Sequence, residues 1–257
     1  MAKSRVKRII LIVLLVMLLL GGLIAFVSLV SNPWNARTLG DIATPVGYTR
    51  VDTGDAAYNE YLRNLPLKKR GAKVYLYDGN LARLQFLSAA VIDIPIISRD
   101  EQCADVTMRL RAEYLWSKHR YSDIRFRSVG GNTLQYEGGG SRSSFERYLK
   151  KVYGACNTTS VFDETSVRKL EDIRPGDVLV FKSRHKGRYG HAILVADVAR
   201  NKKGKVAVLC IEGNTPARNA HVVRNLNPLS NPWHYLRPEG DHWISVFNFH
   251  QNELRHY

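Results

Sequence analysis

The sequence of 257 residues is poor in cysteine, and it lacks the short motifs of several large functional classes. Its three cysteines form no Cys-x-x-Cys pair and no cluster with histidine at zinc-ligand spacing, so no metal is expected. A phosphate-binding loop, a dinucleotide fingerprint and a nucleic-acid-binding module are also absent. We therefore expect no cofactor and no nucleic-acid partner.

Acidic residues are outnumbered, because 38 Lys and Arg stand against 23 Asp and Glu, a formal net charge of +15. Four of the positive charges lie in residues 1–8, directly before the apolar run 9–30, which has neither charge nor proline. About 20 apolar residues span a bilayer, whereas a cleavable signal has an apolar region of about 7–15. The sequence predicts a cytoplasmic tail (1–8) and an uncleaved single-pass anchor (9–30) in the cytoplasmic (inner) membrane. By the positive-inside rule, the C-terminal part is periplasmic or otherwise extracytoplasmic.

Residues 31–46 are polar, contain two prolines and predict a linker, so the folded domain is expected over 47–257. The first half of this domain predicts helices from Asp55, from about Asp100 and at 142–154. Strands are predicted at 72–79 and 89–97, and the glycine-rich stretch 128–141 predicts a surface loop.

Three apolar strands are predicted in the second half, at 178–181, 191–199 and 205–212. The last two are joined by a hairpin with the sequence Arg-Asn-Lys-Lys-Gly. The expected fold class is α+β, with an antiparallel core of three strands packed on the earlier helices. The aromatic segment after Ser230 gives no clear assignment.

The stretch QCADVTMRLRAEYLW, residues 102–116, predicts a helix with Cys103 in or near its first turn. A thiolate is a nucleophile, and a helix N-terminus offers N–H groups and partial positive charge that stabilise it. His191, which opens a strand after Gly190, is the candidate base. If the hairpin turn centres on 201–202, Glu212 faces His191 across the ladder and can orient the imidazole.

Plainer interpretations remain for each of these residues. A single helix cysteine is more often a core residue, and Asn214 lies close enough to Glu212 to replace it as the orienting group. The sequence offers two N-caps for this helix. If Ser98 is the N-cap, Cys103 falls in the second turn. If Asp100 is the N-cap, Cys103 is the third helical residue. The acidic pair at 100–101 would oppose thiolate formation.

The other two cysteines, Cys156 and Cys210, are weaker nucleophile candidates. Cys156 follows a helix in a predicted loop, and Cys210 lies in an apolar strand that should raise its pKa.

The segment RPGDVLVFKSRHKGRYGHAILVADV resembles the second half of the NlpC and CHAP peptidase families. These are papain-like cysteine hydrolases, often murein peptidases or amidases. The resemblance implies a papain-like domain with a Cys-bearing helix, a Pro-Gly-Asp strand, a Gly-His strand and a polar third residue. It implies Cys103 as nucleophile, His191 as base and Glu212 as the orienting group.

The region from about residue 47 to 236 more closely resembles a bacterial domain family of unknown function (4846). The resemblance lies in the segments YLRNLPL, QCADVTMRLRAEYLW, GHAILVADVA and PARNAHVVRNLNPLSNPW. This family implies no agreed activity. It is expected to have glutamine at the position of Glu212, where this chain departs from it.

The sequence as a whole predicts a membrane-anchored cysteine hydrolase of the cell envelope. It would cleave an amide or peptide bond of the cell-wall peptide in peptidoglycan through an acyl-enzyme at Cys103, and a transferase with the same intermediate stays open. The alternative is a non-catalytic envelope module that binds wall glycopeptide or a partner protein. A third interpretation is a basic surface for anionic lipid headgroups or wall polymers. Oligomeric state is not defined by the sequence.

Overall fold

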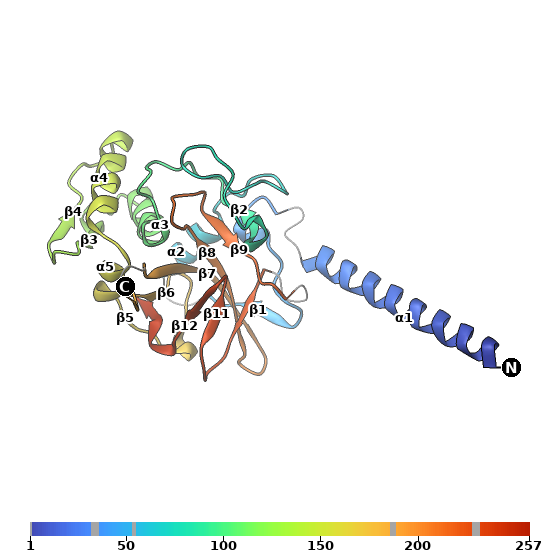
Figure 1. Cartoon of the computed structure of the whole chain (residues 1–257). Helices are drawn as coiled ribbons and strands as arrows, with labels where there is room; N and C mark the ends of the chain where they lie inside the picture. Colours follow the sequence, from blue (N-terminus) through green and yellow to red (C-terminus); the bar gives the residue numbers. More distant parts are fainter. Residues whose placement is uncertain (1, 32–35, 53–54, 186–188, 228–231) are drawn as a thin grey trace.

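An apolar helix precedes a mixed α+β domain (Figure 1). The computed structural model describes residues 2–31, 36–52, 55–185, 189–227 and 232–257. Helix α1 (Ala2–Ser31) contains the window Arg5–Leu23, which is long and apolar enough to span a membrane. This part of the helix packs against nothing in the domain, as a membrane anchor requires.

The domain is built on a nine-stranded sheet with the order β2-β9-β8-β7-β6-β13-β5, to which β1 adds on β7 and β10 on β8. All neighbouring strands are antiparallel. The strands of this sheet are β1 (Tyr48–Arg50), β2 (Ser88–Val91), β5 (Ser166–Val167), β6 (Val178–Phe181), β7 (His191–Asn201), β8 (Val206–Glu212), β9 (His221–Val223), β10 (His234–Leu236) and β13 (Leu254–His256).

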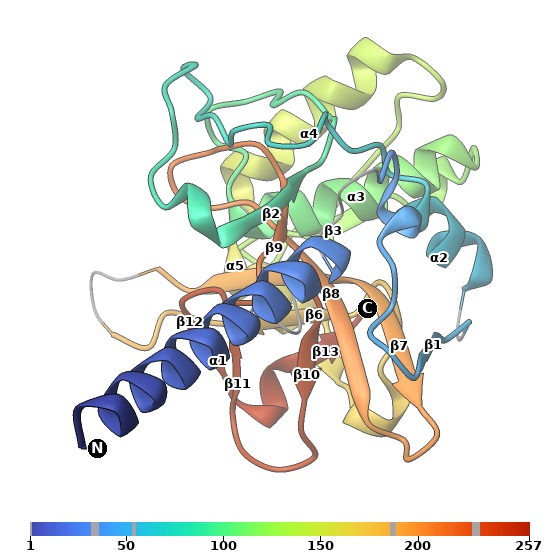
Figure 2. The same ribbon diagram turned by 90° about the vertical axis from the view of Figure 1, so that its right-hand side faces the viewer.

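Helices cover one face of the sheet and a small hairpin covers the other (Figure 2). The helices are α2 (Ala56–Arg63), α3 (Cys103–Ser117), α4 (Arg142–Ala155) and α5 (Thr158–Glu164), with short 3₁₀ turns at Leu39–Asp41, Gln85–Leu87, Tyr121–Asp123, Leu170–Asp172 and Gln251–Glu253. The covering hairpin pairs β11 (His242–Ile244) with β12 (Phe247–Phe249), and a second hairpin pairs β3 (Arg125–Arg127) with β4 (Thr133–Gln135).

Strands β6, β7 and β8 are buried on both faces because their apolar residues supply two separate cores. Ala192, Leu194 and Ala196 of β7 face the helices. The intervening Ile193 and Val195 face the β11–β12 hairpin. Such alternation is what a strand with two covered faces needs, and it explains the continuous apolar sequence.

The structure confirms the α+β class, helices α2 and α4, and the predicted strands β6, β7 and β8. The predicted strand at 72–79 is wrong, because its Asp-Gly end turns the chain back and only isolated bridges form at Tyr75 and Leu76. The strand predicted at 89–97 is limited to β2. The predicted loop 128–141 contains β4, and the predicted three strands are the centre of a larger sheet.

The packed domain begins before residue 47, inside the expected linker 31–46, because Leu39 and Ile42 are fully buried. Residues 32–35 of that linker lie outside the described part of the chain. The aromatic tail after Ser230 forms β10 to β13. Residue 231 lies outside the described part of the chain.

A buried carboxylate ties the N-terminal elements to the sheet. Asp197 of β7 is fully buried, and it accepts hydrogen bonds from Arg50 Nε at 2.6 Å and Arg63 NH2 at 2.9 Å. These arginines come from β1 and from the last turn of α2. Asp197, which both arginines contact, lies at the bulge of β7, where the register shifts between Val195 and Asp197.

We expect Asp197→Ala to lower the free energy of unfolding by about 3 kcal/mol, because it leaves two partly buried guanidinium groups without their carboxylate. Urea unfolding of the full chain in detergent, followed by tryptophan fluorescence, measures this loss. Asp172→Ala is the matched control, since Asp172 is exposed, and it should change stability little. A loss for Asp197→Ala no larger than that of the control would contradict this role.

Candidate active site

Cys103 is the first residue of α3, and the extended Gln102 before it is the N-cap. The backbone N–H of Gln102 donates to Asp105 Oδ2 at 2.9 Å, which fixes the first turn. Neither predicted cap is therefore correct. Ser98 instead accepts from the N–H of Asp100 in a separate turn before the helix. The thiol lies nearer to the helix end than either prediction placed it, where the free N–H groups are.

His191 is the first residue of β7, and only 2% of it is exposed. Its ring lies close enough to the Cys103 thiol for each group to shift the pKa of the other. The glycine before it permits this placement, since a Cβ on Gly190 would lie 2.2 Å from the carbonyl oxygen of Phe181. The structure therefore brings the thiol and the imidazole into one site.

Glu212 holds the other side of the imidazole, with its Oε2 3.2 Å from His191 Nε2. This leaves Nδ1 as the ring nitrogen that faces the thiol. The predicted register was wrong: Leu194 pairs with Ile211, so Glu212 lies diagonal to His191 instead of directly opposite. Diagonal neighbours on one face of a ladder are still within reach of long side chains.

Asn214, the predicted substitute for Glu212, does not take part in this contact. Its Oδ1 accepts a hydrogen bond from the N–H of Thr215 at 2.8 Å. Within the described ranges, no hydrogen bond joins Asn214 to His191.

Three further side chains complete the surroundings of Glu212 and His191, and the sequence analysis found none of them. His221 Nε2 lies 3.2 Å from Glu212 Oε1, and Ser245 Oγ donates to the same oxygen at 3.2 Å. Phe247 stacks on the His191 ring with centroids 3.6 Å apart. The only sequence signal for His221 is its place in a short apolar strand next to β8. Ser245 and Phe247 belong to the unassigned aromatic tail.

Both ring nitrogens of His221 face hydrogen-bond acceptors. Nε2 faces the Glu212 carboxylate, and Nδ1 lies 3.1 Å from the carbonyl oxygen of Asn219. Glu212 is thus a buried anion with a histidine on each oxygen.

The electrostatics of the site favour a thiolate–imidazolium pair. Burial opposes ionisation of Cys103, but the charge and hydrogen bond of His191, with the N–H groups of Ala192 and Ala104, lower the pKa of the thiol. Burial alone would also depress the pKa of His191, but Cys103 and then Glu212 raise it. Each of the two groups therefore favours the charged form of the other.

Two acidic residues near Cys103, Glu101 and Asp105, oppose ionisation of the thiol less than their formal charges would suggest. Glu101 is buried and paired with Arg109, with Oε1 2.5 Å from NH1. Burial raises the pKa of Asp105 well above its usual value, which favours the neutral form of this carboxyl group.

The other two thiols lack such an arrangement, although all three cysteines are free and buried. Burial raises the pKa of Cys210, which lies in the second core. Burial raises the pKa of Cys156 to about 11. Cys156 follows α4 outside any helix or strand, as predicted, and it also caps that helix and lines the cavity described next.

A cavity of about 330 Å³ opens beside Cys103, between the start of α3 and the end of α4. Gln102, Tyr153 and Thr215 are among its lining residues. The Thr215 hydroxyl donates to Gln102 Oε1 at 2.8 Å, which leaves the Gln102 NH₂ group as a donor. The described residues contain no group of histidine, cysteine and acidic side chains able to hold a metal ion.

These observations define a mixed α+β domain behind an apolar helix, with a cysteine, histidine and glutamate gathered at one helix terminus. The sequence profile of the family described as domain of unknown function (4846) matches residues 39–140 and 137–256, and the chain belongs to this family. No curated protein and no solved structure matches the chain.

Glu212 should stabilise the fold in a pH-dependent way. Burial opposes its ionisation, but hydrogen bonds from His191 and His221 lower the pKa of the carboxyl group below its usual 4.5. A carboxyl group with a lowered pKa stabilises the fold above its unfolded-state pKa, and this stabilisation is lost as the pH falls toward the folded-state value.

We expect Glu212→Gln to lower the free energy of unfolding by about 2 kcal/mol at pH 7, and by clearly less at pH 3. Urea unfolding at both pH values measures the difference. Glu171→Gln is the control, since the Glu171 side chain is 74% exposed, and it should show no such pH dependence. An equal loss for Glu212→Gln at both pH values would show that its charge is not what matters.

Proposed function

We propose that the protein is a papain-like cysteine hydrolase of the cell envelope that cleaves an amide bond in the cell-wall peptide. The single observation that carries this proposal is the meeting of Cys103, His191 and Glu212. A thiol at a free helix N-terminus, a partner histidine and a buried carboxylate behind it are the parts that acyl transfer requires.

In the first step, the Cys103 thiolate attacks the carbonyl carbon of the substrate and a C–S bond forms. Gln102 and Cys103 both line the cavity, and we assign the oxyanion to the backbone N–H of Cys103 and the Gln102 NH₂ group. The C–N bond then breaks, and the His191 imidazolium gives its proton to the leaving amine. The products are the free amine and an acyl-enzyme.

In the second step, neutral His191 takes a proton from water, and the resulting hydroxide attacks the thioester carbon. A C–O bond forms, the C–S bond breaks, and the thiolate–imidazolium pair returns with release of the acid. An amine in place of water would give transfer instead of hydrolysis. Glu212 keeps the ring in position and stabilises its charge throughout.

The arrangement of the elements supports a papain-like assignment. The nucleophile opens a helix that packs on an antiparallel sheet, and the histidine and third residue lie on neighbouring strands of that sheet. The Pro175-Gly176-Asp177 segment of the resemblance forms the turn into β6, where Gly176 has φ +95°.

The choice of cell-wall peptide as substrate rests on location and on the resemblance to NlpC and CHAP enzymes. The apolar helix and the basic residues before it favour an anchor with a cytoplasmic N-terminus and an outward-facing domain. The cavity is lined by polar residues such as Gln102, Asn157 and Thr158, which suits a peptide better than a wholly apolar ligand.

We expect the purified full chain in detergent to hydrolyse muropeptides, and Cys103→Ser to lower this activity at least about 1,000-fold. His191→Ala should lose a comparable share, because the thiol then loses its partner charge and proton carrier. Liquid chromatography with mass spectrometry measures the products. Intact-protein mass spectrometry should also show a thiol-reactive probe or an acyl group on Cys103.

Matched controls come from the same chain. His119→Ala and His250→Ala should keep most of the activity, since both are exposed histidines that do not line the cavity. Full activity in Cys103→Ser would refute the nucleophile. No activity in any form, with retained muropeptide binding, would favour the non-catalytic module.

A further inference from the structure

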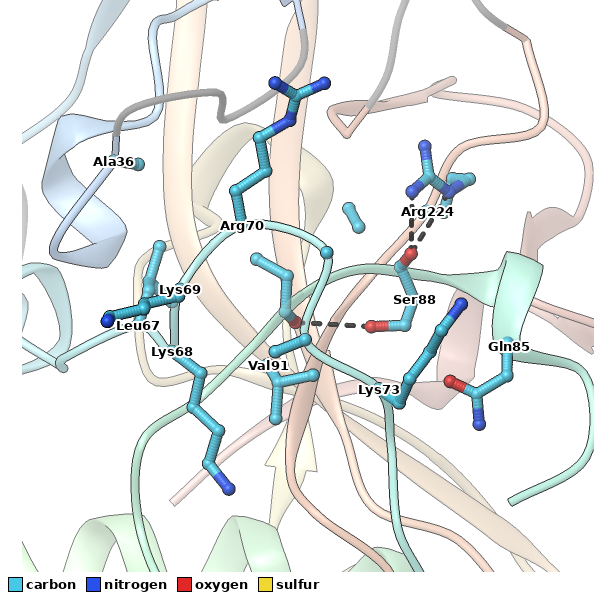
Figure 3. A pocket seen from close by; sticks show the side chains of 14 residues that line it. Ala36, Leu67, Lys68, Lys69, Arg70, Lys73, Gln85, Ser88, Val91 and Arg224 are labelled. Atoms are coloured by element: carbon cyan, nitrogen blue, oxygen red, sulfur yellow. Dashed lines mark hydrogen bonds between the residues drawn. The ribbon is translucent and has the colours of Figure 1, made fainter. Parts of the chain in front are cut away.

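A second cavity, of about 270 Å³, lies between the chain around Lys69 and strand β2 (Figure 3). Five of its lining residues are cationic: Lys68, Lys69, Arg70, Lys73 and Arg224. No aspartate or glutamate is among its lining residues in the described ranges. A concave site with positive charge alone attracts anions.

The five cationic side chains do not all extend in the same direction. In Figure 3, Arg70, Arg224 and Lys73 lie over the top and right of the view, whereas Lys68 extends downward and Lys69 to the left. Arg224 is held in place by hydrogen bonds from Nε and NH2 to the carbonyl oxygen of Ser88, at 3.1 and 2.8 Å. A fixed guanidinium group with two neighbouring cations is a good match for the oxygens of a phosphate group.

Partial burial also makes an anionic ligand favourable here. Burial lowers the pKa of Arg224, which means that its charge is less well solvated than in water. An anion at this position would restore part of the lost solvation.

The cavity is close to the membrane by covalent geometry alone. Ala36 lines the cavity, and α1 ends at Ser31, five residues earlier. Five extended residues span at most about 18 Å. Figure 1 also shows α1 leaving the domain on the side of β2 and β9. If α1 spans the membrane, the cavity lies within reach of its polar surface, where phospholipid headgroups carry phosphate.

We propose that this cavity binds the phosphate group of an anionic phospholipid in the membrane that holds α1. The site is separate from the Cys103 cavity and does not depend on any catalytic activity. Its ligand chemistry is that of a phosphodiester, and the short connection to the anchor favours a membrane lipid over a soluble phosphate compound.

The test uses the full chain in a non-ionic detergent, with lipid binding measured by native mass spectrometry. Phosphatidylglycerol and phosphatidylcholine are titrated separately. The double variant Arg70→Gln/Lys73→Gln removes two exposed cations of the cavity. The control Lys202→Gln/Lys203→Gln removes the same charge from the exposed β7–β8 hairpin.

We expect the wild-type chain to bind phosphatidylglycerol more tightly than phosphatidylcholine. Two cations near a membrane surface account for about a 30-fold change in affinity, so the cavity variant should lose about that factor. The control variant should bind as the wild type does. Circular dichroism of both variants checks that the fold is retained.

Three results would overturn the proposal. The cavity variant could bind phosphatidylglycerol as tightly as the wild type, which would remove the site. Both double variants could lose affinity equally, which would show a general charge effect. Glycerol 3-phosphate could bind the lipid-free chain as tightly as phosphatidylglycerol does, which would assign the cavity to a soluble phosphate compound.

Discussion

The buried Glu212 carboxylate is the constraint on which the site depends. A buried anion is costly unless hydrogen bonds and opposite charges satisfy it. His191 satisfies one oxygen, and His221 and Ser245 satisfy the other. These three partners come from β7, β9 and the turn between β11 and β12, so the ring beside Cys103 is oriented by the packing of the whole sheet.

The main features of the site were predictable because they follow from local sequence and strand adjacency. A cysteine before a helical pattern and a histidine that opens one arm of a hairpin pointed to Cys103 and His191, and Glu212 followed from the other arm. The register was wrong because the hairpin turn is centred near Lys203 and not at 201–202, as the pairing of Ala199 with Ala207 shows, and the bulge beside Val195 shifts the ladder by only one residue. The cap was wrong because the N-cap is Gln102, whose residue type is not a usual cap.

The rest of the site could not be predicted, because it is built from short strands that are far apart in sequence. His221 lies beside Glu212 only through the pairing of β8 with β9, and β9 has three residues. Phe247 reaches His191 because the β11–β12 hairpin packs on the second core. A strand of three residues carries too little alternation to be read from sequence. The same limit applies to the phosphate cavity, whose cations gather from around residue 70 and from Arg224.

The central claim is that the surroundings of Cys103 keep its sulfur ionised near neutral pH. Thiolate absorbance at 240 nm, recorded as the difference between the wild-type chain and Cys103→Ser during a pH titration, tests it most directly. The account predicts that the difference signal is already present at pH 7 and disappears only in acid, because His191 lowers the pKa of the thiol. A signal that appears only above pH 9.0, the usual thiol pKa, would contradict the account.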